Sequence, residues 1–526
     1  MSQLRSNRML SVCLILGGAA FAPMAHAQLG GPPVQYWHEN VPNVQDVAVQ
    51  NEHFGHVSAS GDFDGDGVDD LAIGVPSAQV GTIVGAGAVH VLYGRAGTAL
   101  YPLGQYWYQN LIAGATNESG DWFGSTLASG DFDGDGFDDL AIGSPGETHG
   151  DDGSAGQVQV IYGSVNGLSN ARGQIWHQDR PGVNGETESV DQFGGALAAG
   201  DFDADGVDDL AVGVPGEGLG GVFFEYYGAG AVQVFYGQFG SGLGTARANW
   251  IEEGGMVFGY VGDNDNFGDT LAVGDFNNDG VDDLAIGAPG ERNGSGEVSI
   301  VMGWFGLGLT AHGSQVWSQN SAGVADSVED YDAFGYALAV GDWNADGFDD
   351  LAIGAPFERL GTLGSAGIVH TLVGTINGLT ATGSQSFTQD TGSILDFVEA
   401  GDQFGRALAA GDFNRDGRDD LAIGVMGESL PNTQYGAGIV QILNGASTGL
   451  TTNGNRMWSQ DSRNVGGVAT EQRYFGYSLA VGDFDDDGVD DLVIGTPYDD
   501  PGIVDAGSVN VLLALDGSGD VIGFGP

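Results

Sequence analysis

The chain contains no lysine, and this shortage of positive charge limits its possible partners. All 14 basic residues are arginines, against 71 acidic residues in a chain of 526, so the net charge is −57. Binding to nucleic acid requires basic patches that neutralise phosphates, so the composition excludes nucleic acid as a partner. The same charge disfavours docking on anionic lipid. The 41% of hydrophobic and 10% of aromatic residues still suffice for a large folded core.

The chain also has a single cysteine, Cys13, and it falls in a segment with the pattern of a secretory signal. Two arginines precede an apolar run, and Ala-His-Ala at 25–27 fits a cleavage site with small residues. The run is short for a membrane span of ~20 residues, and no later segment is long and apolar enough to cross a membrane. We expect residues 1–27 to be removed on export. The mature protein, residues 28–526, would then be secreted, periplasmic or bound at the cell surface, with no disulfide to brace it.

A stretch crowded with aspartate occurs seven times along the chain. The first copy, GDFDGDGVDDLAIGVP from Gly61 to Pro76, places five aspartates within nine positions. Each copy follows a Phe-Gly pair and precedes an alternating run such as GAVHVLYG and, in the first six copies, an element centred on an aromatic residue. The chain is therefore a series of repeats of about 70 residues. They begin near residues 52, 121, 191, 265, 332, 402 and 473.

The segments of each repeat predict short strands rather than helices. They run for four to eight residues, are rich in Val, Ile, Leu and aromatic residues, and are bounded by Gly, Asp, Asn or Pro. Four strands in each of seven repeats predict an all-β fold, a seven-bladed β-propeller of four-stranded blades in one domain. Trp37 precedes the first repeat, whereas the seventh repeat lacks its aromatic element. We therefore expect the N-terminal strand to complete the last blade and close the ring.

The aspartate-rich stretch has the ligand pattern of a Ca²⁺ loop. Counted from Asp62, the first copy has carboxylates at positions 1, 3, 5 and 9 and a glycine at position 6, where the chain turns sharply. Ca²⁺ accepts six to eight oxygen ligands in flexible geometry. Position 12 is Ile73 rather than glutamate, and a strand pattern follows, so the loop is not an EF-hand. An alternative is that these are only hairpin turns, which Asp and Gly favour, but seven copies disfavour it.

Two positions of the loop carry further expectations. Asn277, Asn344 and Asn414 replace aspartate at position 3 of the fourth, fifth and sixth copies, which lowers the charge of the ligands and the expected affinity. Position 8 is aspartate in every copy, from Asp69 to Asp490. We expect these carboxylates to lie behind the ligands or to face solvent.

The combination of Phe-Gly, D-x-D-x-D-G-x-x-D and Gly-x-Pro resembles the FG-GAP repeats of the integrin α-subunit N-terminal β-propeller. In that family the loop binds Ca²⁺ through the side chains at positions 1, 3, 5 and 9 and the carbonyl at position 7. Integrins usually carry the full loop in only some blades, whereas here the resemblance implies up to seven Ca²⁺ ions. The implied ligand residues are Asp62, Asp64, Asp66, Val68, Asp70, Asp131, Asp133, Asp135, Phe137, Asp139, Asp201, Asp203, Asp205, Val207, Asp209, Asp275, Asn277, Asp279, Val281, Asp283, Asp342, Asn344, Asp346, Phe348, Asp350, Asp412, Asn414, Asp416, Arg418, Asp420, Asp483, Asp485, Asp487, Val489 and Asp491.

The resemblance also implies where a ligand would bind, on the face opposite the Ca²⁺ loops. Two loops on that face contain aromatic residues, one in the third repeat and one after Trp250. Exposed aromatic clusters often mark binding surfaces, although these residues could equally pack on one another as a small core of the loops. The candidate ligand-binding residues are Phe223, Phe224, Tyr226, Tyr227, Phe258 and Tyr260.

Catalytic motifs are poor. The G-x-S-x-G match at 445–449 coincides with a turn found in other repeats and lacks the strand–elbow–helix context of a nucleophile elbow. We therefore expect no enzyme, but an exported calcium-binding propeller for extracellular recognition or cell adhesion, with a protein or glycan ligand. One alternative is an enzyme or enzyme accessory, because propellers like FG-GAP also accompany phospholipase D and polysaccharide lyases. Another is a structural component of a surface or matrix, which the acidity would suit.

Overall fold

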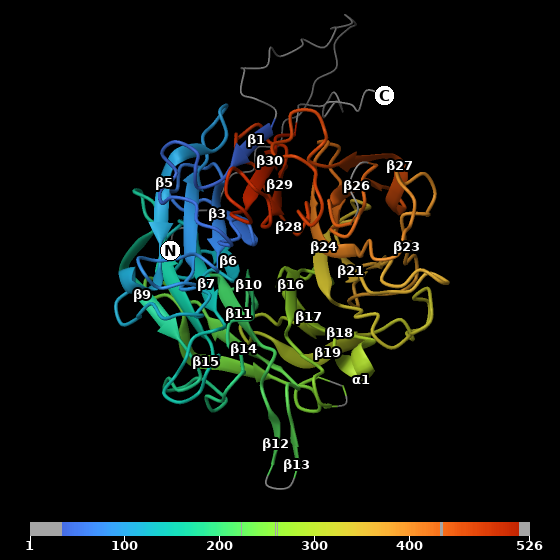
Figure 1. Cartoon of the computed structure of the whole chain (residues 1–526). Coiled ribbons are helices and arrows are strands. Elements are labelled where there is room, and N and C mark those ends of the chain that lie inside the picture. The colour runs from blue at the N-terminus through green and yellow to red at the C-terminus, as the bar shows by residue number, and fades with distance from the viewer. Residues whose placement is uncertain (1–33, 222–223, 258, 260, 432–434, 515–526) are drawn as a thin grey trace, which may run out of the picture.

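The computed structural model describes residues 34–221, 224–257, 259, 261–431 and 435–514, so the expected leader at 1–27 lies outside the described residues. Seven four-stranded antiparallel sheets stand side by side in a ring (Figure 1). The fold is therefore the predicted seven-bladed β-propeller. The helices of the described part are two short turns, η1 (Gln109–Leu111) and α1 (Glu291–Gly294).

In each of the first six blades the chain runs from the innermost strand outwards. The strands are β2 (Val57–Gly61), β3 (Asp70–Val75), β4 (Ala88–Tyr93) and β5 (Tyr101–Trp107); β6 (Thr126–Gly130), β7 (Asp139–Ser144), β8 (Gln157–Tyr162) and β9 (Ser169–Trp176); β10 (Ala196–Gly200), β11 (Asp209–Val214), β14 (Ala231–Tyr236) and β15 (Gly244–Ile251); β16 (Thr270–Gly274), β17 (Asp283–Ala288), β18 (Glu297–Met302) and β19 (Thr310–Trp317); β20 (Ala337–Gly341), β21 (Asp350–Ala355), β22 (Ile368–Leu372) and β23 (Ser386–Phe387); and β24 (Phe404–Gly411), β25 (Asp420–Val425), β26 (Ile439–Ala446) and β27 (Gly449–Trp458).

The seventh blade joins the two ends of the chain. Its strands β28 (Ser478–Gly482), β29 (Asp491–Thr496) and β30 (Ser508–Leu512) come from the C-terminal repeat. The outer strand is β1 (Val34–Trp37), which pairs antiparallel with β30 so that Val34 faces Leu512 and Trp37 faces Val509. The prediction that the N-terminal strand closes the ring is confirmed.

The Phe-Gly pair of each repeat joins one blade to the preceding one. Phe123, for example, is fully buried, and its backbone N–H donates to the carbonyl of Ala86 in the first blade at 3.2 Å. Gly124 has a φ of +85°, and a Cβ at this position would lie 2.7 Å from the carbonyl oxygen of Ala88. Only glycine fits both the backbone angle and the close approach, which explains the repeated pair.

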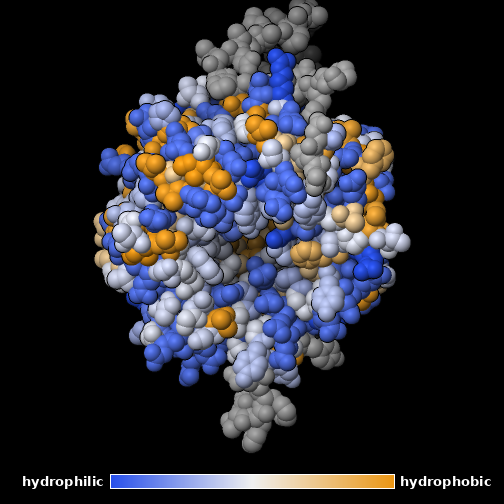
Figure 2. Space-filling view, in the orientation of Figure 1, coloured by the Kyte–Doolittle hydropathy of each residue, from blue (hydrophilic) through white to orange (hydrophobic). Residues whose placement is uncertain are grey.

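The core is divided among the boundaries between blades. Each of the seven clusters of buried apolar residues found in the described chain has members from two neighbouring blades. At the closing boundary, Trp37 of β1 and Val509 of β30 pack with Leu71 and Phe54 of the first repeat. A single blade has two apolar faces, so it is buried only between two neighbours. Figure 2 shows that the ring presents mainly hydrophilic residues on the face in view, with apolar patches between them.

Candidate calcium loops and ligand face

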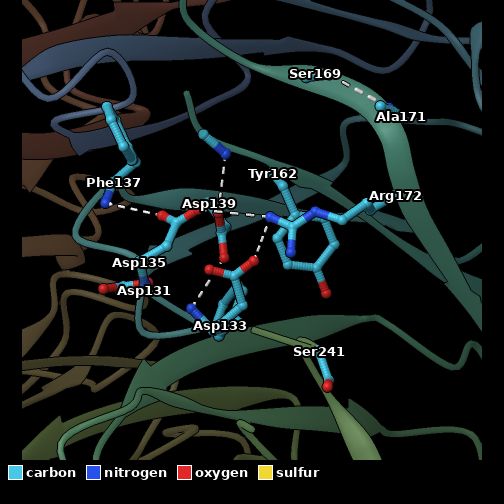
Figure 3. A network of polar contacts seen from close by, with 12 residues as sticks. Asp131, Asp133, Asp135, Phe137, Asp139, Tyr162, Ser169, Ala171, Arg172 and Ser241 are labelled. Carbon is cyan, nitrogen blue, oxygen red and sulfur yellow. Dashed lines mark hydrogen bonds and ion pairs between the residues drawn. The ribbon is translucent and has the colours of Figure 1, made fainter. Parts of the chain in front are cut away.

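The predicted ligand residues of each repeat lie in the loop between the first and second strands, with position 9 at the start of the second strand. In the second blade the carboxylates of Asp131, Asp133 and Asp139 converge (Figure 3), and one oxygen of each lies within 4.8 Å of the others. The third blade has the equivalent group at positions 1, 3 and 9, whereas the group in the first blade uses positions 1, 3 and 5. These residues are Asp62, Asp64 and Asp66 in the first blade, and Asp201, Asp203 and Asp209 in the third.

Backbone hydrogen bonds hold each loop around its first aspartate. In the second blade, Asp131 accepts the N–H of Asp135 at 3.0 Å and the N–H of Gly136 at 2.8 Å. Position 1 accepts the same two bonds in all seven loops. Gly136 has a φ of +88°, which explains the glycine at position 6. The oxygens are thus positioned by the backbone before any ion binds.

The aspartate at position 9 is buried and ties the loop to the next hairpin. Asp139 accepts the N–H of Phe132 at 3.0 Å and the N–H of Gly163, after β8, at 2.8 Å. Burial, with a further contribution from the carboxylates of Asp133 and Asp131, raises the pKa of Asp139 to about 9. The pKa of Asp70 is likewise raised to about 8, chiefly by burial. Without a cation the cluster therefore favours a proton at neutral pH, and a divalent cation would offset the same charge.

The chemistry of the loop fits Ca²⁺. Asp133 is fully buried, and besides one guanidinium its carboxylate has no polar partner among the described residues. Figure 3 shows the guanidinium of Arg172, from β9, forming an ion pair with this carboxylate. In the third blade Arg247 Nη1 lies 2.5 Å from Asp203 Oδ2. The position thus attracts positive charge, and its donors are the hard oxygens that Ca²⁺ prefers. The side chains at positions 1, 3, 5 and 9 would hold the ion, which would join the two strands electrostatically.

In the three loops with asparagine at position 3, the asparagine amide donates a hydrogen bond to the aspartate at position 9. The amide of Asn414 donates to the two carboxylate oxygens of Asp420 at 3.0 and 2.8 Å. Burial raises the pKa of Asp420 to about 7, whereas the pKa of Asp283, in the Asn277 loop, rises to about 8, as for Asp70. The amide satisfies part of the negative charge that a cation would satisfy in the all-aspartate loops. Weaker binding in these loops stays a prediction.

The aspartates at position 8 lie behind the ligand residue at position 1 of the preceding loop, and they link neighbouring blades. Asp138 accepts the N–H of Asp62, in the preceding blade, at 2.9 Å, and its own N–H donates to the carbonyl of Asp62 at 3.1 Å. The first of these bonds occurs at all seven boundaries, including Asp483 to Asp69 at the closure. Asp139, the next residue, instead accepts the N–H groups of Phe132 and Gly163 within its own blade.

We expect Asp208→Ala, at position 8 of the third blade, to destabilise the fold without changing Ca²⁺ binding. The substitution leaves the half-buried N–H of Asp131 without its acceptor, which costs about 1–3 kcal/mol at most. Asp208→Asn keeps an acceptor oxygen and is the matched control. Chemical denaturation measures the free energy of unfolding, and calorimetric titration measures Ca²⁺ affinity. A lost Ca²⁺ site with unchanged stability would instead assign position 8 to the metal.

The aromatic loop of the third repeat forms a hairpin that projects from the ring (Figure 1). It consists of β12 (Leu219–Gly221) and β13 (Phe224–Tyr226), and it follows the end of β11, whereas the acidic loop precedes β11. The hairpin and the acidic loop are therefore at opposite ends of that strand. Tyr226 and Tyr227 are 40% and 66% exposed, so these two side chains are not buried in a core of the loops. Phe224 lies in β13, and the other candidates, Phe223, Phe258 and Tyr260, lie outside the described residues.

The structure brings the two aromatic segments together at the border of the third and fourth blades. The N–H of Tyr227 donates to Asp263 Oδ1 at 3.1 Å, and the N–H of Asn264 donates to the carbonyl of Tyr227 at 2.8 Å. A groove of about 520 Å³ opens at the base of the hairpin, with Tyr226 and Trp250 in its wall. Glutamates also line it, and sequence reasoning missed them, although the repeated Gly-Glu after Gly-x-Pro was a signal for Glu217. These glutamates are Glu217, Glu252 and Glu253.

The fold and the loops define a class of protein: a seven-bladed propeller with an acidic loop in every blade. The family model for the FG-GAP repeat matches seven segments, which together make up about half of the chain. The chain therefore belongs to the FG-GAP repeat family. The matched residues are 54–92, 123–161, 193–235, 267–301, 334–372, 404–443 and 475–512.

Curated relatives include an enzyme and a receptor subunit. Phosphatidylinositol-glycan-specific phospholipase D of Homo sapiens is 26% identical over 392 residues, which cover 71% of this chain and 43% of the relative. Integrin alpha pat-2 of Caenorhabditis briggsae is 29% identical over 290 residues, covering 49% and 21%. The chain thus spans less than half the length of these relatives. A solved structure, the Dos1 propeller, is 12% identical with a TM-score of 0.40, covering 88% of this chain and 93% of the other.

The described helices are too short, and not apolar enough, for any of them to traverse a bilayer.

Proposed function

We propose that this protein is an exported, calcium-binding propeller that recognises a protein or glycan ligand outside the cell, as in cell adhesion, and that it is not itself an enzyme. The observation that carries the proposal is the projecting β12–β13 hairpin, with two exposed tyrosines beside a groove. Tyrosine supplies a large contact area together with a polar tip, and is enriched among residues that dominate binding energy.

The groove has the composition of a site for a polar ligand. Trp250 and Tyr226 offer aromatic surface, while Asn184 and Glu252 offer hydrogen-bonding groups. Trp250 Nε1 donates to Glu252 at 2.9 Å, which orients that carboxylate. A few polar groups placed among aromatic surface are typical of binding sites. In this proposal the Ca²⁺ loops brace the ring from the other face and the hairpin face does the binding.

Similarity to an integrin alpha chain supports an adhesive role and an extracellular location for this protein. Similarity to a phosphatidylinositol-glycan-specific phospholipase D supports a second candidate, a propeller that is or accompanies an enzyme. One assay distinguishes the two candidate functions. The purified protein should release products from phosphatidylinositol-glycan only if the second candidate is right. A purely structural role in a surface or matrix would give neither binding nor turnover.

Replacing Tyr226 and Tyr227 together by serine is expected to weaken ligand binding by at least about 10-fold, as the loss of interface aromatics typically does. Because both side chains are exposed, the melting temperature should change little. Binding is measured on a glycan array and on a panel of purified extracellular matrix proteins, with and without EDTA.

The matched control is Phe305→Ser. Phe305 is 75% exposed and follows β18, whose end lies beside the start of β17 and therefore on the acidic-loop face. We expect this variant to bind as the unchanged protein does. Selective binding that survives the double tyrosine substitution would contradict the hairpin site, and no selective binding by the unchanged protein would favour the structural role.

A further inference from the structure

On the hairpin face, a buried amide–carboxylate pair spans four of the boundaries between blades. A glutamine that follows the outer strand of one blade donates its side-chain N–H to a glutamate of the next blade. Each glutamate follows the second strand of its own blade. Each buried carboxylate thereby receives a donor. The pairs are Gln109–Glu147 at 2.5 Å, Gln178–Glu217 at 2.5 Å, Gln319–Glu358 at 2.7 Å and Gln389–Glu428 at 2.6 Å.

The boundary between the third and fourth blades replaces the amide by a third carboxylate. Glu291 is the glutamate after β17, and Glu253, after β15, stands where the other boundaries have glutamine. One oxygen of Glu253, one of Glu291 and one of Asp265 lie within 4.8 Å of one another. The three side chains are buried, with exposed fractions of 3%, 2% and 4%. The substitution removes a donor and adds a negative charge at the same place.

Three oxygens of this cluster have no hydrogen-bond partner among the described residues. Neither carboxylate oxygen of Glu253 has a hydrogen-bond partner in the described chain, nor does Oε2 of Glu291. Glu253 therefore has a buried carboxylate with no hydrogen-bond partner among the described residues, and this carboxylate faces those of Asp265 and Glu291. Leaving such a group uncompensated is costly in a folded protein.

One arginine lies at the cluster, and it is shared with a fourth carboxylate. Arg292 Nε lies 3.3 Å from Glu291 Oε1, and its Nη2 lies 3.0 Å from Glu297 Oε2. Half of the Arg292 side chain is exposed, so solvent screens its charge. A single guanidinium does not balance four carboxylates, and it does not contact Glu253.

The loop over the cluster is built from glycines that approach the carboxylates closely. A Cβ on Gly259 would lie 2.9 Å from Cδ of Glu253, and a Cβ on Gly262 would lie 2.8 Å from Oδ2 of Asp265. The N–H of Gly262 also donates to Asp265. The covering chain therefore leaves room for the carboxylates and orients one of them.

We propose that Glu253, Asp265 and Glu291 bind one Ca²⁺ ion at the boundary between the third and fourth blades, separately from the seven aspartate loops. Three carboxylates supply up to six hard oxygen ligands, and the open groove at Glu253 gives the ion a path from solvent. The ion would connect Glu253 of one blade to Asp265 and Glu291 of the next. Because Asp263 and Asn264 hold the backbone of Tyr227, the ion would also fix the segment that carries the hairpin.

The competing explanation is a proton. Burial, together with the nearby charge of Glu291, raises the pKa of Glu253 to about 9, so a protonated carboxyl would also relieve the repulsion. A proton and a Ca²⁺ ion differ in electron density and in stoichiometry, and both differences are measurable.

The test uses Tb³⁺ as an anomalous scatterer in place of Ca²⁺, in crystals of the unchanged protein and of Glu253→Gln. Glu253→Gln introduces the residue that four other boundaries carry, so we expect it to fold normally. The expected result is an anomalous peak among the three carboxylates of the unchanged protein that is absent from the variant, while peaks in the aspartate loops remain. In solution, the number of Ca²⁺ ions bound at saturation, measured by equilibrium dialysis, should fall by one.

The reciprocal variant, Gln319→Glu, replaces the amide that donates to Glu358 by a carboxylate at the next boundary, where one oxygen each of Glu329, Asp332 and Glu358 already lies within 4.8 Å of the others, and should gain a peak there. No peak at Glu253 while the aspartate loops are occupied would overturn the proposal, and so would a peak that persists in Glu253→Gln. Empty aspartate loops with an occupied Glu253 cluster would overturn the calcium role of the loops instead, so the two failures are distinguishable.

Discussion

Removal of Ca²⁺ is expected to lower the melting temperature of this protein by about 5–10 °C. Extracellular modules bind Ca²⁺ with dissociation constants of ~0.1–1 mM, and with that affinity ~10 mM Ca²⁺ would stabilise the fold by about 1.4–2.7 kcal/mol per occupied loop. Four loops have aspartate at position 3, namely those with Asp64, Asp133, Asp203 and Asp485. Together these four loops would stabilise the fold by ~6–11 kcal/mol. The shift in melting temperature is this free energy divided by the entropy of unfolding, which is ~1 kcal/mol/K for a chain this long.

Differential scanning calorimetry in excess Ca²⁺ and in EGTA measures the shift. EGTA with Mg²⁺ is the control, because Mg²⁺ demands a smaller octahedral site and keeps its water. Superimposed melting curves in Ca²⁺ and EGTA would contradict the role of the loops.

The difference in melting temperature between Ca²⁺ and EGTA should also widen as the pH rises. The pKa of Asp139 is raised to about 9 in the ion-free fold, far above the ~3.9 of an unfolded aspartate. The folded state then binds more protons, so the ion-free protein loses stability from about pH 4 to pH 9.

The fold was predictable because one pattern repeats. A single Phe-Gly pair or a single Asp-Gly turn is ambiguous, but their fixed spacing in seven copies predicts both the blades and their number. The closing strand was predictable from a mismatch, since Trp37 had no repeat of its own and the seventh repeat had no outer aromatic. The structure adds the reason for the pair: Phe54 and its counterparts bond the preceding blade, a contact between segments that local sequence does not show.

The side-chain roles were harder to predict, because they depend on what lies across a boundary. Asp138 was expected to lie behind the ligands or to face solvent, but its partner could not be named, because the N–H of Asp62 is 76 residues away. Glu253 carried no signal in the sequence, and its significance emerges only from comparison with Gln178 at the equivalent boundary. Spacing within a repeat predicts which groups share a loop. Contacts between repeats can be identified only once the arrangement of the blades in the ring is known.

Deleting residues 28–45 is expected to cost at least about 5 kcal/mol of stability, since losing a buried tryptophan alone costs about 3–5 kcal/mol. Trp37 is 6% exposed and packs in the core of the closing boundary. Gln35 donates to the carbonyl of Leu100 in the first blade at 3.2 Å, and the hydroxyl of Tyr36 donates to Asp499 at 2.6 Å. The deletion would also expose the edge of β30, which invites association between molecules. Chemical denaturation and light scattering measure the two effects.

Adding the missing strand as a separate peptide distinguishes ring closure from general damage. A synthetic peptide of residues 28–45 should bind the truncated protein and restore its melting temperature, because β1 pairs with β30 through the backbone and fills the core through Trp37. The same peptide with Trp37→Ala keeps the backbone pairing but leaves a cavity, so its rescue should be weaker. Trp176→Ala, in an outer strand that is continuous with its blade, is the control for the cavity alone. If the truncated protein melted as the intact one does, the ring would not depend on β1, and the stability of the propeller would have to reside within its individual blades.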